Sequence, residues 1–167
     1  MVATRFRDSE RHVWTFAYEI LVHCPRCRAC AIIRRRPDVA PGRHFFQELD
    51  RPHRVVCSHC GFVQNWEWKP RGQWDKSPVA FGGPVDPYFG YPLWLSTPAS
   101  RGVLWAYNGK HLDYLEAFIG AKLRGGPRGR TGDYRQTLVE KLPAWIKSAK
   151  HRDELLALIT ELRHRLP

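Results

Sequence analysis

Two short stretches decide the fold, HCPRCRAC at residues 23–30 and VVCSHCG at residues 55–61, and each contains a Cys-x-x-Cys pair. Each pair follows a run of β-branched or aromatic residues, the first over Val13–Val22 and the second over Arg54–Val56, and such runs predict strands. A tight turn at the end of a strand brings the two thiols of one pair to the same side. Twenty-nine residues separate the two pairs, which is enough chain for two hairpins whose tips face each other.

Four thiols in two such pairs have the ligand spacing of a zinc site, and they are Cys24, Cys27, Cys57 and Cys60. Zinc prefers four soft ligands at the corners of a tetrahedron. Pairs of this kind in a reducing compartment are more often metal ligands than disulfides. A shell of four thiolates leaves no coordination position open to a substrate, so we expect one structural Zn²⁺ ion rather than a catalytic one.

Cys30 is the fifth cysteine, and it forms a second, overlapping Cys-x-x-Cys with Cys27. We prefer the pair that begins at Cys24 because it leaves a strand directly and contains a proline. Cys30 is then expected to be a small buried residue of the next strand. His23 and His59 lie beside the pairs and stay open as alternative ligands.

The rest of the chain predicts a mixture of short strands and helices. Strands are expected at Ala31–Arg35 and Phe62–Trp68, and Leu93–Ser96 is expected to pair with Val103–Tyr107 as a hairpin. Residues 69–92 combine five prolines and four glycines with many aromatic side chains, which predicts an ordered irregular segment.

Apolar residues at helical spacing predict short helices in the C-terminal part. Asn108 is expected to cap the first helix, and shorter helices are expected around residues 138–142 and 143–150, with a last one from about Arg152. The buried stripe is expected to contain Leu112, Leu115, Phe118, Ile119, Leu155, Ile159 and Leu162, together with the tryptophans. We therefore predict an α+β fold in which three segments form one compact unit: a zinc β-ribbon at 1–68, an aromatic and proline-rich linker with a hairpin at 69–110, and C-terminal helices at 111–167.

Composition and charge limit the partners. The chain has 167 residues with 27 basic and 16 acidic side chains, a formal net charge of +11. Such a charge favours an acidic partner, either nucleic acid or an acidic protein. The sequence contains neither a spanning apolar segment nor the apolar core of a signal peptide, so we expect a cytoplasmic protein without a membrane partner.

Arginines are the candidate contacts to phosphate groups, because a guanidinium holds a phosphate with two parallel hydrogen bonds. The alternatives left open are a solvated strand end for the first group and a mobile linker for the RGGPRGR segment at 124–130. The candidate nucleic-acid-binding residues are Arg34, Arg35, Arg36, Arg54, Arg128 and Arg130.

Residues 13–68, with Cys-Pro-x-Cys first and Cys-x-x-Cys-Gly second, resemble a zinc ribbon of the TFIIB or TFIIS type. The resemblance covers about a third of the chain and implies a three-stranded zinc β-ribbon in the company of nucleic-acid-linked proteins. One departure is Arg28, which stands where such ribbons usually carry glycine after the first pair.

The C-terminal half carries a second resemblance. Its motifs are Leu104–Asn108, His111-Leu112, Leu115-Glu116, Leu142-Pro143, Trp145, Lys147–Lys150 and Arg152. With these motifs, nearly the whole chain is similar to an uncharacterised family of bacterial proteins that carry the same N-terminal zinc ribbon. That resemblance implies a bacterial, cytoplasmic, zinc-binding protein and adds no reaction.

Asn108 and His111 follow a predicted strand and open a helix, a placement similar to the end of an HNH nuclease. Capping explains the same residues, and no paired upstream histidine accompanies them, so a metal-dependent nuclease stays only an alternative. We expect a non-enzymatic zinc-binding protein that associates with nucleic acid through its arginines. The other alternative is a protein-interaction module, such as an adaptor or immunity-type protein, that binds an acidic protein and uses zinc only for structure.

Overall fold

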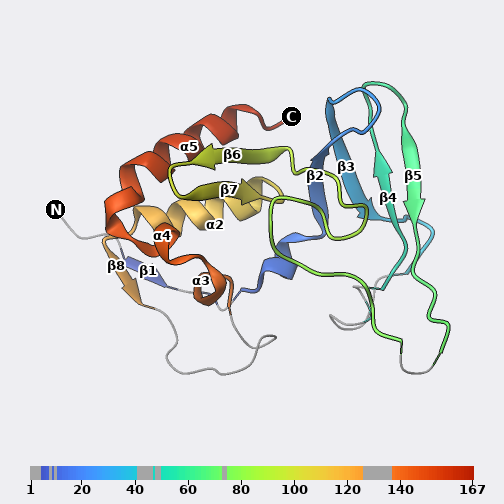
Figure 1. Cartoon of the computed structure of the whole chain (residues 1–167), viewed down its shortest axis with the longest axis horizontal. Coiled ribbons are helices and arrows are strands. Elements are labelled where there is room, and N and C mark those ends of the chain that lie inside the picture. The colour runs from blue at the N-terminus through green and yellow to red at the C-terminus, as the bar shows by residue number, and fades with distance from the viewer. Residues whose placement is uncertain are drawn as a thin grey trace. The chain divides into compact units, whose positions relative to one another are not determined.

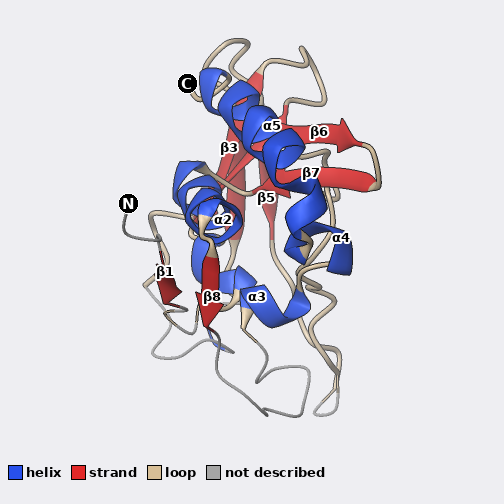
Figure 2. Ribbon diagram, turned by 90° about the vertical axis from the view of Figure 1, so that its left-hand side faces the viewer, coloured by secondary structure: helices blue, strands red, loops and turns tan. Residues whose placement is uncertain are grey.

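A computed structural model describes residues 5–7, 9, 11–40, 47, 50–72, 75–125 and 137–167 of the chain. Its fold is mixed α+β, with an antiparallel sheet and a few helices (Figure 2). The chain divides into two compact units, which we call the sheet unit, Tyr18–Trp94, and the helical unit, Met1–Ala17 with Leu95–Pro167. The predicted division at residues 68 and 110 stays a prediction.

The sheet unit contains a four-stranded antiparallel sheet in the order β2-β3-β4-β5 (Figure 1). The strands are β2 (Glu19–His23), β3 (Cys30–Arg35), β4 (His53–Val56) and β5 (Val63–Trp66). Strands β2 and β3 form one hairpin and β4 and β5 form a second, and the two hairpins pair through β3 and β4. The resemblance implied three strands, and there are four because each cysteine pair sits at the tip of its own hairpin.

One face of this sheet is apolar and buried, and we call it the inner face. Ile20, Ile33 and Val55 occupy one row across β2, β3 and β4 and are fully buried. In the next row of this face, His53 stacks on Tyr88 with ring centroids 3.8 Å apart. We call the opposite side of the sheet the outer face, and alternate residues of every strand point toward it.

Tyr88 belongs to a loop that is organised by one buried carboxylate. Asp86 accepts hydrogen bonds from the backbone N–H groups of Tyr88, Phe89 and Tyr91, at 2.9, 2.8 and 2.6 Å. Three donors around one carboxylate hold the turn of a loop whose two arms meet in an antiparallel bridge between Val85 and Pro92. Within the described part of the 69–92 segment, this loop matches the predicted ordered irregular structure.

The predicted strand over Val13–Val22 is wrong in its first half. Val13–Phe16 forms a 3-10 helix, η1, and β2 starts only at Glu19. The backbone N–H and the hydroxyl of Thr15 both bond the carbonyl of His12, at 3.0 and 2.7 Å. These local bonds satisfy the backbone without a partner strand, and alternation over this stretch was only partial.

The helical unit pairs two helices with a β-hairpin. The hairpin is β6 (Leu95–Ala99) with β7 (Gly102–Ala106), and the longer helices are α2 (Gly109–Gly120) and α5 (Arg152–His164). Shorter elements complete it: the parallel pair β1 (Arg5–Arg7) and β8 (Leu123–Gly125), with α3 (Leu138–Lys141), α4 (Ala144–Lys147) and η2 (Ala149–His151).

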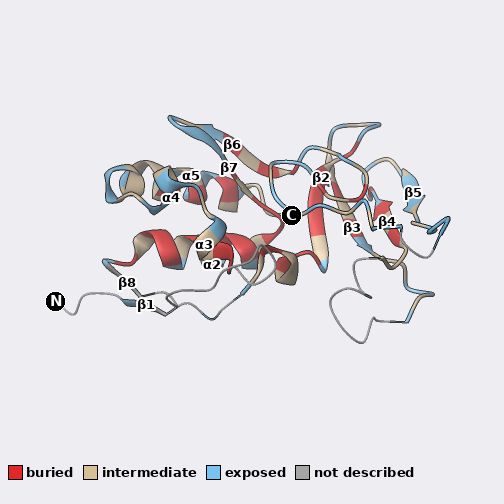
Figure 3. Cartoon of the chain, turned by 60° about the horizontal axis from the view of Figure 1, so that its bottom comes forward, coloured by how far each residue is buried: buried red, intermediate tan, exposed pale blue. Residues whose placement is uncertain are grey.

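The predicted apolar stripe is confirmed: all of its aliphatic and phenylalanine members are buried (Figure 3). The tryptophans were expected to share this core, and that prediction is wrong, because every tryptophan that the structure describes keeps part of its surface exposed. The indole of Trp145, for example, lies against the backbone of Gly102 at the hairpin turn.

Candidate metal centre

The tips of the two hairpins of the sheet unit bring four cysteines together. The Sγ atoms of Cys24, Cys27, Cys57 and Cys60 all lie within 4.8 Å of one another. Two of the separations cross between hairpins: Cys24 to Cys60 at 3.7 Å and Cys27 to Cys57 at 3.6 Å. A tetrahedron with metal–sulfur bonds of about 2.3 Å has sulfur–sulfur edges of about 3.8 Å. The spacing fits four ligands around one ion and is far from the ~2.05 Å of a disulfide.

Both turns that carry these cysteines have the same hydrogen-bond pattern. Cys24 N–H bonds the Ala29 carbonyl at 2.8 Å, and Arg28 N–H bonds the Cys24 carbonyl at 2.9 Å. In the second turn, Cys57 N–H bonds the Phe62 carbonyl and Gly61 N–H bonds the Cys57 carbonyl, each at 2.9 Å. Equivalent turns on two paired hairpins place two sulfur atoms from each side around a common centre.

The residue after each pair has a left-handed backbone. Gly61 has φ +72° and Arg28 has φ +67°. Glycine adopts this region freely, whereas a residue with a Cβ atom adopts it at a cost of about 1 kcal/mol. The Nδ1 atom of His23 lies 3.2 Å from the Arg28 carbonyl and bonds it across the turn. The turn therefore keeps its geometry although arginine replaces the glycine expected there.

The acidities of the thiols differ sharply within the cluster. Burial raises the pKa of Cys24, but the backbone N–H groups of Cys27 and Arg26 outweigh it and bring that pKa down to about 7. For Cys27, the backbone N–H of Ala29 lowers the pKa, while burial and the neighbouring thiols raise it, to about 12. Cys24 therefore forms a thiolate readily, whereas a second thiolate beside it, at Cys27, is disfavoured. A divalent cation at the centre removes that opposition, because metal binding displaces the remaining protons.

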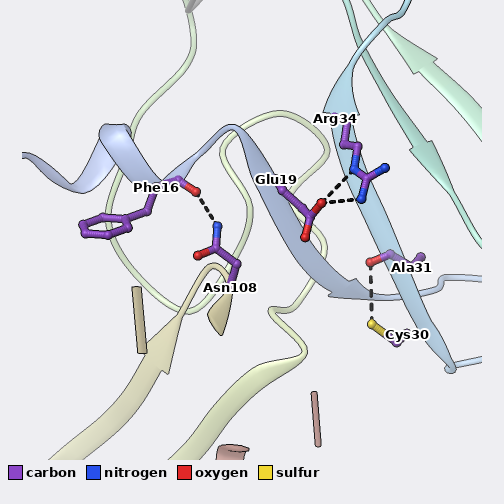
Figure 4. A network of polar contacts seen from close by, with 6 residues as sticks. All are labelled: Phe16, Glu19, Cys30, Ala31, Arg34 and Asn108. Carbon is purple, nitrogen blue, oxygen red and sulfur yellow. Dashed lines mark hydrogen bonds and ion pairs between the residues drawn. The ribbon is translucent and has the colours of Figure 1, made fainter. Parts of the chain in front are cut away.

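The remaining cysteine and the nearby histidines lie outside this cluster. Cys30 begins β3, is half-buried rather than buried, and has its Sγ 3.9 Å from the Ala31 carbonyl (Figure 4). Burial raises the pKa of its thiol to about 11, and its sulfur is not among the four that lie together. Neither His23 nor the exposed His59 belongs to the group of four sulfur atoms.

Three of the predicted arginines share the outer face of the sheet, and we call Arg34, Arg36 and Arg54 the arginine face. Arg34 and Arg54 are directly opposed on β3 and β4, and Arg36 lies two residues beyond Arg34. Arg35 is in register with His53 and therefore points to the inner face. Arg128 and Arg130 lie outside the residues that the structure describes.

Sequence reasoning missed the polar neighbours of these arginines. Arg34 forms an ion pair with Glu19 across the β2–β3 register (Figure 4). Arg36 pairs with Asp38, and the side chain of Arg54 donates to Asn65 Oδ1 at 2.8 Å. Asp38 could have been found from the sequence, because it lies two residues after Arg36. Glu19 and Asn65 could not, because strand register alone brings them to Arg34 and Arg54.

Asn108 and His111 behave as a helix cap. Asn108 Oδ1 accepts from the His111 N–H at 3.0 Å, and its amide nitrogen donates to the Phe16 carbonyl at 2.7 Å (Figure 4). His111 Nδ1 accepts from the Tyr107 N–H at 3.2 Å, and burial lowers the pKa of its imidazole to about 3. Across the described residues, the four cysteines are the only group of three or more side chains arranged to hold a metal.

The described helices include none with the length and apolar character that crossing a bilayer requires. Comparison with known proteins found no match among protein-family models, curated proteins or solved structures. The structure establishes a four-cysteine cluster that could hold one metal ion.

Proposed function

We propose that the four-cysteine cluster holds one structural Zn²⁺ ion and that the sheet unit is a zinc ribbon of the TFIIB type. The sulfur separations of 3.6 and 3.7 Å support this, since they match the edges of a zinc–thiolate tetrahedron. Four cysteine ligands also leave no coordination position for a substrate. We take the protein to be non-enzymatic on that basis.

The protein's partner in this proposal is nucleic acid, bound through the arginine face. The carrying observation is the direct opposition of Arg34 and Arg54 across β3 and β4, which puts two arginines on the outer face. Their guanidinium groups turn apart, that of Arg34 to Glu19 on β2 and that of Arg54 to Asn65 on β5. Arg36, one residue past the end of β3, adds a third arginine where the chain still bonds the Pro52 carbonyl at 2.9 Å. Phosphate oxygens are the acceptors that such a group of arginines recognises.

The ion pairs on this face do not prevent phosphate binding. The Arg34 side chain is 61% exposed and that of Glu19 28% exposed, so water screens their attraction. Exposed ion pairs contribute about 0–1 kcal/mol each. A phosphate that accepts hydrogen bonds from both Arg34 and Arg54 would replace the one carboxylate partner of Arg34, that of Glu19.

Fluorescence anisotropy of labelled single-stranded DNA, duplex DNA and RNA, titrated with the zinc-loaded protein, tests this proposal. Affinity should fall steeply between about 50 and 200 mM salt, because phosphate contacts release counterions. The double variant Arg34→Gln with Arg54→Gln should weaken binding about tenfold or more and reduce the salt slope by about 1 for each arginine replaced.

The matched control removes the same charge elsewhere, with Lys110→Gln and Lys150→Gln in the helical unit, where both side chains are exposed. It should retain most of the affinity and the full salt slope of the unsubstituted protein. Absence of binding at low salt, affinity independent of salt, or equal losses in both double variants would contradict the proposal.

A further inference from the structure

Strand β5 forms one edge of the four-stranded sheet, and the hydrogen-bond pattern shows which of its backbone groups are open. The Cys57 N–H bonds the Phe62 carbonyl, so residues 57 and 62 form a hydrogen-bonded pair. Such pairs alternate in antiparallel sheets, so Gln64 and Trp66 direct their backbone groups at β4. The N–H and C=O groups of Val63 and Asn65 consequently point away from the sheet.

The opposite edge of the sheet is closed. His23 N–H on β2 bonds the Pro92 carbonyl, and Trp94 N–H bonds the Leu21 carbonyl, each at 2.9 Å. Val22 and Leu93 also form an antiparallel bridge. The chain thus covers its β2 edge with residues 92–94, and no described residue makes a comparable backbone contact to Val63 or Asn65.

Nothing in β5 itself obstructs pairing. Its sequence, Val63–Trp66, contains no proline, glycine or lysine, and its register with β4 is continuous, without a bulge. These are devices that proteins use to protect exposed edges, and the one that β5 does have is its length of only four residues. Val63 is 51% exposed and its cross-strand neighbour Val56 42% exposed, which leaves an apolar pair beside the open backbone.

We propose that β5 binds an extended acidic segment of a partner protein, which adds to the sheet as a fifth strand. The segment would exchange backbone hydrogen bonds with Val63 and Asn65, as in other complexes formed by strand addition. The side chains that the segment places on the outer face of the sheet would lie beside the exposed Val56 and Val63 and the arginines of that face. This binding mode is independent of phosphate recognition and goes beyond the function proposed above.

Charge selects an acidic segment rather than a second copy of this chain. Arg54 donates to Asn65 Oδ1, so its guanidinium reaches over β5 toward the open edge. It stands one strand spacing, about 4.8 Å, from that edge, within reach of a carboxylate on an added strand. Pairing of two copies through β5 would instead bring together chains that each carry a net charge of +11.

The first experiment titrates the zinc-loaded protein into a short fluorescein-labelled peptide of alternating valine and glutamate. The peptide should bind with a dissociation constant below about 1 mM. A valine–lysine peptide of the same length should not bind. N-methylation of one alternating set of amides should abolish binding and methylation of the other set should not, since only one set faces β5.

Two variants at one position isolate the backbone contribution. Asn65→Pro removes an outward N–H that β4 does not use, and Asn65→Thr removes the same side chain while keeping that N–H. Peptide affinity should fall about tenfold in Asn65→Pro relative to Asn65→Thr. Metal content and circular dichroism check folding, and the N-methylated peptides provide the test if the proline variant does not fold.

Several results would overturn the proposal. These are no peptide binding up to about 1 mM, equal binding of both N-methylated forms, or equal affinity of the two Asn65 variants. A concentration-dependent dimer that Asn65→Pro abolishes would assign the edge to a second copy instead. Asn65→Pro and Asn65→Thr both lose the amide to which Arg54 donates, so the two variants should bind oligonucleotides equally while they differ in peptide affinity. This proposal and the nucleic-acid proposal can therefore fail separately.

Discussion

Arg152, the first residue of α5, holds the end of α2 through Ile119. Its Nε donates to the Ile119 carbonyl at 3.1 Å, and a terminal nitrogen donates to the Ala121 carbonyl at 3.0 Å. The last carbonyls of a helix have no partner within the helix and carry partial negative charge. A single guanidinium therefore satisfies acceptors of α2 and fixes the start of α5 against them.

Substituting this arginine should destabilise the helical unit. Hydrogen bonds to charged groups contribute about 1.5–3 kcal/mol, so Arg152→Leu should lower the free energy of unfolding by about 2 kcal/mol. Arg152→Lys should lower it by less, because lysine keeps the charge but not both hydrogen bonds. Urea denaturation followed by circular dichroism measures the change. Arg163→Leu is the control on the same helix, because it removes the exposed pairs with Asp113 and Glu116 and should cost less than about 1 kcal/mol. Equal losses in both variants would contradict this account.

Metal dependence separates the fifth cysteine from the other four. Cys57→Ser should lose the bound ion and most cooperative unfolding of the sheet unit, because metal binding and folding are coupled. Cys30→Ser should keep one Zn²⁺ per chain and the melting temperature of the unsubstituted protein, since its sulfur is not in the cluster. Elemental analysis and thermal melts with and without chelator measure both effects. Loss of metal in the Cys30 variant alone would show that the cluster uses a different ligand set.

The two left-handed residues predict opposite substitution effects. Arg28→Gly should raise the free energy of unfolding of the zinc-loaded protein by about 0.5–1 kcal/mol, and Gly61→Ala should lower it by about 1 kcal/mol. A Cβ atom at Gly61 would meet nothing within 4 Å, so its penalty is backbone strain alone. Arg26→Gly, in the same turn without a positive φ, is the control and should not stabilise the protein. Chemical denaturation measures all three, and stabilisation by Arg26→Gly would contradict the argument.

The buried imidazole of His111 predicts that acid destabilises the fold. Burial lowers its pKa from 6.5 to about 3, so the native state excludes a proton that the unfolded chain accepts. Its contribution to stability is complete above pH 6.5 and declines as pH falls toward 3, by up to about 1.4 kcal/mol per pH unit. Denaturation at pH values from neutral to acidic should show this slope, and His111→Gln should reduce it.

Acid would also release a metal ion held by the four cysteines, but this would affect the unsubstituted protein and the variant alike. The informative quantity is therefore the difference in slope between them. His164→Gln, at an exposed position of α5, should keep the slope of the unsubstituted protein. An unchanged slope in His111→Gln would show that the buried imidazole does not set the pH dependence.

Features that depend only on residues close together in the sequence could be predicted from it. The spacing of each Cys-x-x-Cys pair defines a turn by itself, so the four clustered cysteines were predictable without knowing the sheet. The stripe of α2 and the cap at Asn108 follow from helical periodicity and from bonds over three residues. The left-handed backbone of Arg28 was not predictable from residue type, because arginine rarely adopts it.

Features that join distant residues were decided only by the tertiary structure. The run Arg34–Arg36 forms one basic cluster in the sequence, yet strand pleating sends Arg35 to the inner face and strand register places Arg54 beside Arg34. Whether a sheet edge is covered depends on where residues 92–94 return to β2, and local composition carries no information about that. The sequence by itself indicated the two Cys-x-x-Cys turns and the helical stripe, because turns and helices are built from local bonds. The arginine face and the open edge arose from strand pairing, which joins segments that are far apart in the chain.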